Sequence, residues 1–408
     1  MRFVKFFLKL CVIIIIIALA FFIDGESKRQ ALKDGVQHEY YTTGELHYEI
    51  PHHDEHIDGA LKEYYEGGEL KSSYCYVQSE RSGPFKEYYL QGQLKIEGTF
   101  KAAKLQGMVK NYYAMGALES AVEYVDNLAQ GAFEKYYESG ALKIKGQYRQ
   151  GKGEGVFNEY FEDGRIKFAT TYQDDVIDGP RYEYYPNGQV KRIENYKNVE
   201  LDGMIREFYE DGTLRTVEGY QQGKKHGLSQ HYGANGKSLL IVNYVDGKKE
   251  GISREYFDHG QWKSEANYAN DKLHGTFKEY FANGRLKKRE FYVNGLKAGK
   301  AMTYYEHGML RSMENYRYDQ RNGLSRIYNY FNGKLLVEAQ FVNDQLEGVR
   351  KQFFEDGILE EIAHYKNNLR DGITKQYYRN GKIKNEIVYK DDKLLFERQY
   401  DLKGQPLF

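Results

Sequence analysis

The stretch GTFKEYFANGRLKKREFYVNGLKAG, from Gly275 to Gly299, decides the fold because the chain repeats its pattern many times. A distant stretch, GPFKEYYLQGQLKIEGTFKAAKLQG from Gly83 to Gly107, has glycine, paired aromatics, glycine, leucine and a late aromatic at the same spacing. The starting glycine recurs at residues 35, 59, 83, 107, 131, 155, 179, 203, 227, 251, 275, 299, 323, 348 and 372, and 13 of the 14 intervals are 24 residues. A fixed period of this length predicts one continuous repeat array rather than several ordinary domains.

Each repeat reads as a β-hairpin. Two runs rich in strand-forming aromatics are separated by turn signals such as PNGQ and EDGR. Pro186 in PNGQ fits the first central position of a type I turn, because proline fixes φ at about −65°. The following glycine then takes the left-handed position of a bulge. We therefore expect a type I turn with a glycine bulge at every hairpin tip.

This turn sets a register with two expected faces. It places Tyr160 opposite Ile166 and Glu159 opposite Lys167. One face would collect the early aromatic, the leucine, the small residue after each starting glycine and the late aromatic, and would be buried. The other would carry Glu, Lys and the second aromatic, as in an antiparallel sheet with one wet face. The prediction is an all-β, elongated antiparallel array of about 15 hairpins, or about 30 strands, with an N-terminal apolar helix.

The composition argues against nucleic-acid binding, disorder and a disulfide-stabilised fold. Lys plus Arg and Asp plus Glu each number 59, so no net charge attracts nucleic acid, and we expect no nucleic-acid partner. The 15% aromatic content argues against disorder. Cys11 and Cys75 are the two cysteines, too few for a disulfide framework, so stability must come from packing.

The N-terminal segment looks like an export signal. Residues 1–9 are basic, residues 10–23 are uninterruptedly apolar, and the linker 24–34 begins with acidic residues. This order predicts a cytoplasmic N-terminus and an exported array, which occupies 35–395 and ends in a degenerate cap at 396–408. The apolar run is short, and both an uncleaved anchor and a cleaved signal peptide remain open. The apolar Phe21, Phe22 and Ile23 beyond the small-residue box favour the anchor, which would hold the array on the membrane.

The linked motifs YxNGxxxG and YYxxGxLK, which recur from Gly35 to about Gly404, resemble the variant form of the MORN repeat. That form is abundant in bacteria and is often labelled a YwqK-type antitoxin component. The resemblance implies a scaffolding, membrane-associating or partner-binding module with no shared chemistry. Its label implies an alternative function, inhibition of one toxin or enzyme. The chain departs from the common MORN form in using Tyr and Leu where that form often has Trp.

Candidate chemistry is sparse. The cluster HHDEH, His52 to His56, could bind a transition metal, but a polar loop in a degenerate first repeat explains it more simply. A glutamate recurs four residues after most starting glycines, and such copies suit Glu–Lys pairing better than catalysis, which needs a unique environment. We therefore expect no catalytic residues, no metal site and no cofactor.

The tyrosines offer the functional hypothesis with physical support, because tyrosine gives a large contact area at low entropy cost. On the expected wet face, the second aromatic is free to contact a partner. The candidate partner-binding residues are Tyr65, Tyr89, Tyr113 and Tyr137. The sequence thus predicts a non-enzymatic, exported or membrane-anchored scaffold that binds a protein partner or a cell-envelope component.

Overall fold

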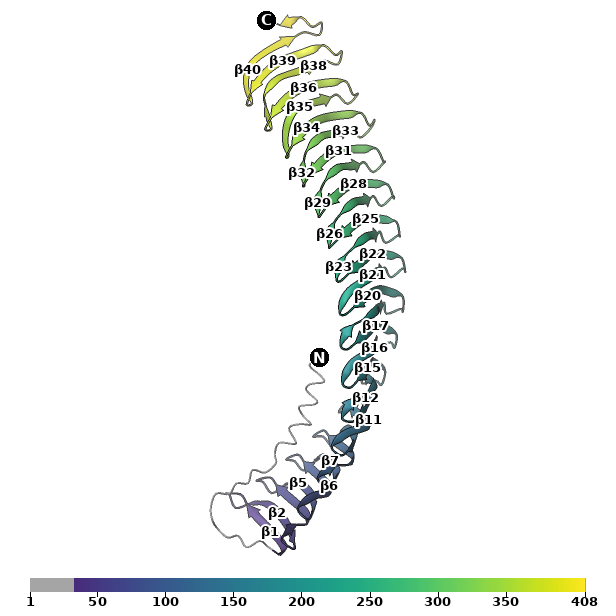
Figure 1. Ribbon diagram of the computed structural model, residues 1–408, viewed down its shortest axis with the longest axis vertical. Helices are drawn as coiled ribbons and strands as arrows, with labels where there is room; N and C mark the ends of the chain where they lie inside the picture. Colours follow the sequence, from purple (N-terminus) through teal and green to yellow (C-terminus); the bar gives the residue numbers. More distant parts are fainter. Residues whose placement is uncertain (1–32, 408) are drawn as a thin grey trace. The chain divides into compact units, whose positions relative to one another are not determined.

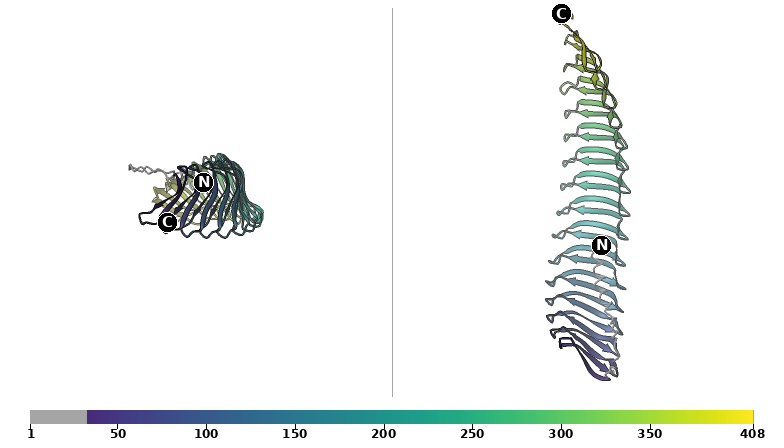
Figure 2. Two further views of the ribbon diagram at one scale, coloured as in Figure 1. Left: turned by 90° about the horizontal axis from the view of Figure 1, so that it is seen from below. Right: turned by 90° about the vertical axis from the view of Figure 1, so that its left-hand side faces the viewer.

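The computed structural model describes residues 33–407, which form strands joined by short turns (Figure 1). The strands pair antiparallel in chain order, so the predicted β-hairpin array is confirmed. The contacts divide the chain into two compact units. Unit 1 runs to Leu201 and adds Glu210–Gly212, and unit 2 holds Asp202–Tyr209 and Thr213–Phe408. Within each unit, successive hairpins lie side by side (Figure 2).

The strands of unit 1 are β1 (Asp34–Tyr40), β2 (Leu46–His53), β3 (His56–Ile57), β4 (Gly59–Tyr64), β5 (Leu70–Val77), β6 (Glu80–Tyr88), β7 (Leu94–Lys101), β8 (Lys104–Leu105), β9 (Gly107–Tyr112), β10 (Leu118–Val125), β11 (Leu128–Tyr136), β12 (Leu142–Arg149), β13 (Lys152–Gly153), β14 (Gly155–Tyr160), β15 (Ile166–Gln173), β16 (Val176–Tyr184), β17 (Val190–Lys197) and β18 (Glu200–Leu201).

The strands of unit 2 are β19 (Gly203–Phe208), β20 (Leu214–Gln221), β21 (Lys224–Tyr232), β22 (Ser238–Val245), β23 (Lys248–Lys249), β24 (Gly251–Tyr256), β25 (Trp262–Ala269), β26 (Lys272–Leu273), β27 (Gly275–Tyr280), β28 (Leu286–Val293), β29 (Leu296–Lys297), β30 (Gly299–Tyr304), β31 (Leu310–Arg317), β32 (Gln320–Arg321), β33 (Gly323–Tyr328), β34 (Leu335–Val342), β35 (Gln345–Phe353), β36 (Leu359–Lys366), β37 (Leu369–Arg370), β38 (Gly372–Tyr377), β39 (Ile383–Lys390), β40 (Lys393–Tyr400) and β41 (Pro406–Leu407). The described residues thus hold 41 strands rather than about 30. The number is higher because the residue directly before the starting glycine often interrupts the strand, so that a two-residue strand such as β3 precedes a longer one such as β4.

The hairpin tips have the predicted turn. At the tip between β4 and β5, the N–H of Gly68 donates to the carbonyl oxygen of Tyr65 at 2.8 Å. The N–H of Tyr65 in turn donates to the carbonyl oxygen of Glu69 at 2.8 Å. Gly68 has a φ of 87°, a left-handed conformation that glycine adopts without steric cost. The type I turn with a glycine bulge is therefore confirmed at this tip, but the tip between β33 and β34 is one residue longer, and there the N–H of Gly333 donates to the carbonyl oxygen of Asn329, four residues before it.

The turns between hairpins are of a different kind. Between β5 and β6 the chain reverses over two residues, Gln78 and Ser79, whose φ values are 50° and 67°. Two successive positive φ values define a type I′ turn, whose twist matches that of the flanking strands. Aspartate, asparagine and glycine recur at these positions because they tolerate the left-handed region best.

The predicted register is right at one pair and wrong at the next. Tyr160 lies opposite Ile166 as expected, but Glu159 lies opposite Phe168 and not opposite Lys167. Lys167 is an extra residue in a second bulge, which the sequence interpretation did not include. The ion pair still forms diagonally, with Lys167 Nζ 3.4 Å from Glu159 Oε1.

The second bulge also corrects the assignment of faces. An extra residue reverses the alternation of side chains beyond it, so the late aromatic joins the face of Glu and Lys. Glu159 and Tyr172 line the same cavity, and Lys167 lies over the ring of Phe161 on that side. We call the face that carries these four side chains the cavity face, and the face that carries Tyr160 the opposite face. The expected buried face of early aromatic, leucine and late aromatic is therefore wrong.

Burial is spread along the cavity face rather than gathered in one core. The residue two positions after each starting glycine is often deeply buried there, such as Val109 and Ile205, which are 4% and 2% exposed. Val109 packs in one buried cluster with Phe85 and Ile96 of the preceding hairpin. The residue directly after the starting glycine points the other way, and Val156 is 52% exposed. Each hairpin therefore buries its apolar side chains mainly against its neighbours, as in other repeat proteins.

The fold class needs one further correction. The structure contains no helix within residues 33–407, so the expected N-terminal apolar helix is not supported. The segment 10–23, on which that expectation fell, lies outside the described residues. Nothing in the described part of the chain is a helix of the length and apolarity needed to cross a membrane.

Candidate functional site

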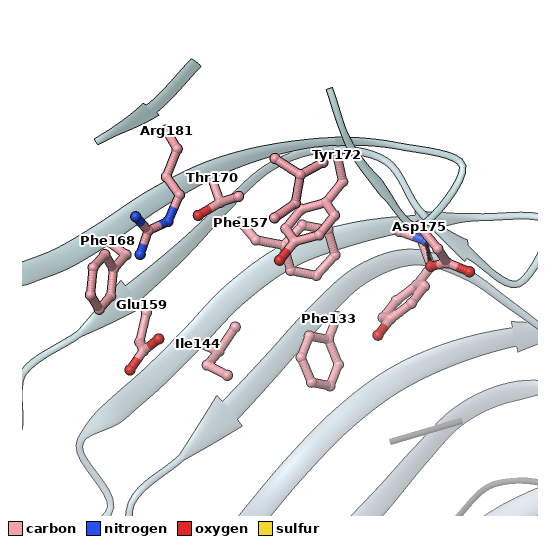
Figure 3. A pocket seen from close by; sticks show the side chains of 12 residues that line it. Phe133, Ile144, Phe157, Glu159, Phe168, Thr170, Tyr172, Asp175 and Arg181 are labelled. Atoms are coloured by element: carbon pink, nitrogen blue, oxygen red, sulfur yellow. Dashed lines mark hydrogen bonds between the residues drawn. The ribbon is translucent and has the colours of Figure 1, made fainter. Parts of the chain in front are cut away.

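A cavity of about 300 Å³ opens on the cavity face of unit 1, where β11 to β16 place their side chains (Figure 3). Five of the twelve residues that line it are aromatic. The rings come from two successive hairpins, β11–β12 and β14–β15: Phe133, Tyr148, Phe157, Phe168 and Tyr172. The remaining wall combines apolar and polar groups: Ile144, Gly153, Glu159, Thr170, Asp175, Ile177 and Arg181. An aromatic hollow with a few polar groups is typical of a recognition site.

The aromatic wall is held by edge-to-face packing. The rings of Phe157 and Tyr172 lie 5.2 Å apart at 76°, and those of Tyr148 and Phe157 lie 5.8 Å apart at 81°. Such pairs add about 0.5–1.5 kcal/mol each beyond the area they bury. Burial raises the pKa of Tyr172, so its hydroxyl stays protonated at neutral pH and its ring stays a neutral π surface. The rings of the wall therefore pack against one another as neutral aromatic surfaces.

Gly146 makes room for this wall. A Cβ atom at residue 146 would lie 2.3 Å from a carbon of the Phe157 ring, far inside van der Waals contact. The ring of Phe157 therefore occupies the space that a side chain at residue 146 would fill. Gly153, at the other end of the hairpin, also leaves space beside the Phe157 ring. A Cβ atom at residue 153 would lie 3.3 Å from both Phe157 and Asp175.

The polar groups on one side of the cavity form a linked set. The guanidinium of Arg181 donates from Nη1 to Glu194 Oε2 at 2.7 Å and lies 4.5 Å from the centre of the Phe168 ring. Glu194 is deeply buried, so this ion pair compensates its charge. Glu159 is paired with Lys167. In Figure 3, Arg181, Thr170, Glu159 and Phe168 lie together, away from Asp175.

Asp175 stands apart from this set. Its Oδ1 accepts the backbone N–H of Gly153 at 2.6 Å, which ties the turn of one hairpin to the preceding hairpin. Asp175 makes no ion pair among the residues that the structure describes. The cavity therefore holds one carboxylate without a cation beside it.

The four predicted partner-binding tyrosines lie elsewhere, at the hairpin tips. Tyr65, Tyr89, Tyr113 and Tyr137 are half-buried and do not line the cavity. Each hydroxyl donates to a carbonyl oxygen of the next hairpin, at 2.8 to 2.9 Å; the acceptors are Tyr88, Tyr112, Tyr136 and Tyr160. The hydroxyls therefore join successive repeats, while the role of the four tyrosines in partner binding stays a prediction.

Removing one of these hydroxyls should weaken the fold measurably. We expect Tyr113→Phe to lower the free energy of unfolding by about 0.5–1.5 kcal/mol, because it deletes one hydrogen bond and keeps the ring. Thermal unfolding followed by circular dichroism measures the change. Tyr318, which is 66% exposed, provides the matched control, and Tyr318→Phe should leave the midpoint unchanged. Equal effects of the two changes would contradict a structural role for the tip hydroxyls.

The sequence interpretation did not identify the cavity. The sequence pattern places the late aromatics, Tyr172 among them, on a face that is expected to be buried, and it does not single out Gly153 or Asp175. A signal was nevertheless present: residue 153 is glycine where several other repeats carry Lys or Arg, as at Lys249 and Arg321. The histidine cluster also lies away from the cavity, and His53 Nδ1 is 2.8 Å from Asp34 Oδ1. Within residues 33–407, no group of three or more His, Cys, Asp or Glu side chains is arranged to hold a metal ion.

Comparison with known families identifies the repeats. The family model described as the MORN repeat variant matches residues 57–78, 81–102, 129–150, 177–198, 249–270, 273–294, 346–367 and 370–391. These eight segments are therefore repeats of the MORN variant type, which confirms this part of the sequence interpretation. No curated protein matches the chain.

Several solved structures align with most of the chain but do not superpose on it. The "Crystal Structure of TcdB2-TccC3" is 10% identical, covers 91% of this chain and 27% of its own, and has a TM-score of 0.16. The "Structure of Photorhabdus luminescens Tc holotoxin pore, Mutation TccC3-D651A" is 12% identical, covers 91% of this chain and 26% of its own, and also has a TM-score of 0.16. The chain spans about a quarter of these proteins. At such scores the likeness carries no argument about function.

Proposed function

Because the chain carries eight repeats of the MORN variant type in a series of hairpins, we propose that it is a non-enzymatic scaffold that binds a protein partner through the cavity face. The observation that carries the proposal is the cavity between β11 and β16. Five aromatic rings line it, and it is large enough to admit a side chain at about 300 Å³. Binding energy in protein interfaces concentrates where an anchoring side chain fills such a pocket.

The arrangement of carboxylates supports a role in binding rather than in catalysis. Glu183 lies 2.7 Å from Lys191, and Glu279 lies 2.6 Å from Lys287, so one ion pair recurs from repeat to repeat. A catalytic acid or base needs an environment of its own, with a shifted pKa suited to its task. A ladder of equivalent pairs supplies structural complementarity instead.

We also propose that the array works outside the cytoplasm, attached to the membrane through residues 10–23. The support is the order of charges around this apolar run, basic before it and acidic after it. A reporter enzyme that is active only outside the cytoplasm, fused after Phe408, should be active. Activity of a reporter that works only in the cytoplasm would contradict export. Sequencing of the mature N-terminus separates an anchor, which keeps Met1 or Arg2, from a cleaved signal peptide.

Site-specific photo-crosslinking tests partner binding. A benzophenone amino acid in place of Phe168 puts a reactive group into the cavity of the full-length chain in its own cells. We expect irradiation to produce one dominant protein adduct, which mass spectrometry identifies. Trp262 provides the matched control, because it is 42% exposed and lies on the opposite face, 5.3 Å from Arg254 and 5.9 Å from Tyr280.

The outcomes separate the candidate surfaces. An adduct from residue 168 and none from residue 262 supports binding at the cavity face. The same reagent at Tyr89 tests the four tip tyrosines, and an adduct there alone would move the binding surface to the hairpin tips. Identical adducts from Phe168 and Trp262, or an adduct with a non-protein envelope component, would contradict the proposal of a protein partner at the cavity.

A further inference from the structure

One recurring arrangement links a turn, a ring and a cation. Five of the turns between hairpins have aspartate as their second residue, each with positive φ: Asp175, Asp271, Asp319, Asp344 and Asp392. Each side chain accepts a backbone N–H from the preceding hairpin. The donors are Gly153, Lys249, Lys297, Arg321 and Arg370 in the same order, at 2.6, 2.7, 2.6, 3.0 and 2.7 Å. The backbone geometry is therefore the same at all five turns.

Four of the five donors are Lys or Arg, and each places its charge over the late aromatic ring next to the turn. The pairs are Lys249 over Tyr268, Lys297 over Tyr316, Arg321 over Phe341 and Arg370 over Tyr389, at 5.1, 5.2, 4.0 and 5.3 Å from the ring centres. Arg321 also donates from Nε to Asp344 Oδ1 at 3.1 Å. In that case the guanidinium lies against both a ring and a carboxylate, two groups that attract a cation.

The fifth turn has the ring and the carboxylate but no cation. Tyr172 takes the place of Phe341, Asp175 takes the place of Asp344, and Gly153 takes the place of Arg321. All three residues line the cavity. The missing side chain at residue 153 therefore helps to leave the cavity open.

Neutral turns provide an internal comparison. Asn127 and Asn368 occupy the same turn position, and each accepts the backbone N–H of a leucine, Leu105 and Leu346, at 2.7 Å. Asparagine thus accompanies an apolar neighbour, while aspartate accompanies a cation at every turn except the one at residue 175. The carboxylate of Asp175 is not needed for the backbone hydrogen bond, because an amide oxygen makes that bond equally well.

We propose that the cavity binds a cationic side chain, arginine or lysine, supplied by the protein partner. The inference rests on the proposed function and names the chemistry that the partner presents. The charged end lies over the Tyr172 ring and against Asp175, where the chain's own Arg321 lies in the equivalent place. The aliphatic stem packs on Phe157, whose ring lies 3.3 Å from the position of a Cβ atom at residue 153. In this proposal the partner supplies the cation that the chain itself supplies at the four other turns with aspartate in this position.

Blocked tripeptides with a central arginine, lysine or citrulline test the inference directly. Citrulline has nearly the shape of arginine and no charge. Saturation-transfer difference NMR on the full-length chain in detergent measures weak binding to a protein of this size. We expect the arginine or the lysine peptide to bind at least tenfold more tightly than the citrulline peptide. The tighter of the two cationic peptides identifies the side chain that the partner supplies.

Asp175→Asn is the decisive variant, because asparagine keeps the acceptor for the Gly153 N–H and removes only the charge. It should weaken binding of the preferred cationic peptide at least fivefold and leave the citrulline peptide unchanged. Asp319→Asn, at a turn whose cation Lys297 is in place, is the matched control and should change neither. Gly153→Lys should abolish binding by filling the cavity from within. Circular dichroism verifies that each variant is folded.

Equal binding of the arginine, lysine and citrulline peptides, or an Asp175→Asn variant that binds like the native chain, would overturn the inference. Its failure is distinguishable from failure of the proposed function. If residue 168 forms adducts but the chain shows no preference for cationic peptides, the proposal of a partner-binding scaffold is supported and the proposal of a cationic ligand is rejected. If the chain binds peptides in a charge-dependent way but residue 168 forms no adduct, the cavity's preference for a cation is supported and the proposal of a protein partner at the cavity is rejected.

Discussion

Deleting residues 107–130, one full period, should leave a folded chain that is one hairpin shorter. The deletion joins Gln106 directly to Gly131, and each residue beyond the junction then meets the same kind of neighbour as before. The hydroxyl of Tyr89, for example, exchanges the carbonyl oxygen of Tyr112 for that of Tyr136, which occupies the same position in its own repeat. Stability in such arrays is a sum of repeat and neighbour terms, so a cooperative thermal transition should persist within a few degrees of the native midpoint.

Deleting half a period should have a much larger effect. Removal of residues 107–118 takes away β9 and its hairpin tip, so every later strand runs in the reverse direction relative to the first hairpins. The hairpin tips after the junction then lie on the edge of the sheet opposite to the earlier tips. Side chains across the junction therefore meet residues from other positions of the repeat than in the native chain. We expect loss of the cooperative transition around the junction, measured by circular dichroism and by hydrogen exchange. Equal damage from the two deletions would show that the repeats do not fold as interchangeable modules.

The second large effect is expected at Gly146. Gly146→Ala puts a Cβ atom 2.3 Å from the Phe157 ring, so either the ring or the strand must move. Overpacking of this kind costs about 1–3 kcal/mol of unfolding free energy, and here it also displaces a wall of the cavity. Chemical denaturation measures the loss, and the tripeptide titration should show weakened binding in the same variant.

Two comparisons make the Gly146 prediction specific. Gly67→Ala is the control, since its Cβ atom would meet only the mobile carboxylate end of Glu69, and its cost should stay within about 0.5 kcal/mol. Phe157→Leu, combined with Gly146→Ala, should cost at least about 1 kcal/mol less than the sum of the single changes, because the smaller side chain relieves the clash. Strict additivity would mean that the ring is not what the alanine meets.

The cavity also explains why the repeat is not uniform in unit 1. Gly146 admits the ring of Phe157, and Gly153 leaves the ring of Tyr172 without a cation over it. Both departures concern glycines that take the place of larger side chains on the cavity face. The cavity thus forms where two side chains are smaller than in most other repeats, while the backbone hydrogen bonds between the strands continue through this region.

Local features were predictable from the sequence because they depend on residues close together in the chain. The period fixed the hairpin, and Pro186 followed by Asn187 and Gly188 indicated the type I turn with its glycine bulge. The first cross-strand pair, Tyr160 with Ile166, follows directly from that turn. Turn chemistry is encoded within a few residues, since φ preferences are properties of single side chains.

The second bulge was not predictable in this way. Lys167 is an ordinary strand residue, with no glycine or proline to mark it, and its bulge depends on how neighbouring strands pair. This one extra residue places Tyr172 and its counterparts on the face of Glu and Lys, whereas the sequence pattern predicts that they share a face with the early aromatic and the leucine. The tip tyrosines likewise look free in the sequence, because the carbonyl oxygens that accept their hydroxyl protons lie 23 residues away.

By itself, then, the sequence determined the repeat, the turn at each hairpin tip and the antiparallel ladder, all of which follow from short-range backbone preferences and a fixed period. Only the tertiary structure decided which face is buried and where the cavity lies. The cavity needs Phe133 from one hairpin and Phe157 and Tyr172 from the next, together with Gly153 in β13 and Asp175 in the following turn. Their proximity depends on the register of every intervening pair, because one shifted residue would turn each of these side chains to the opposite face.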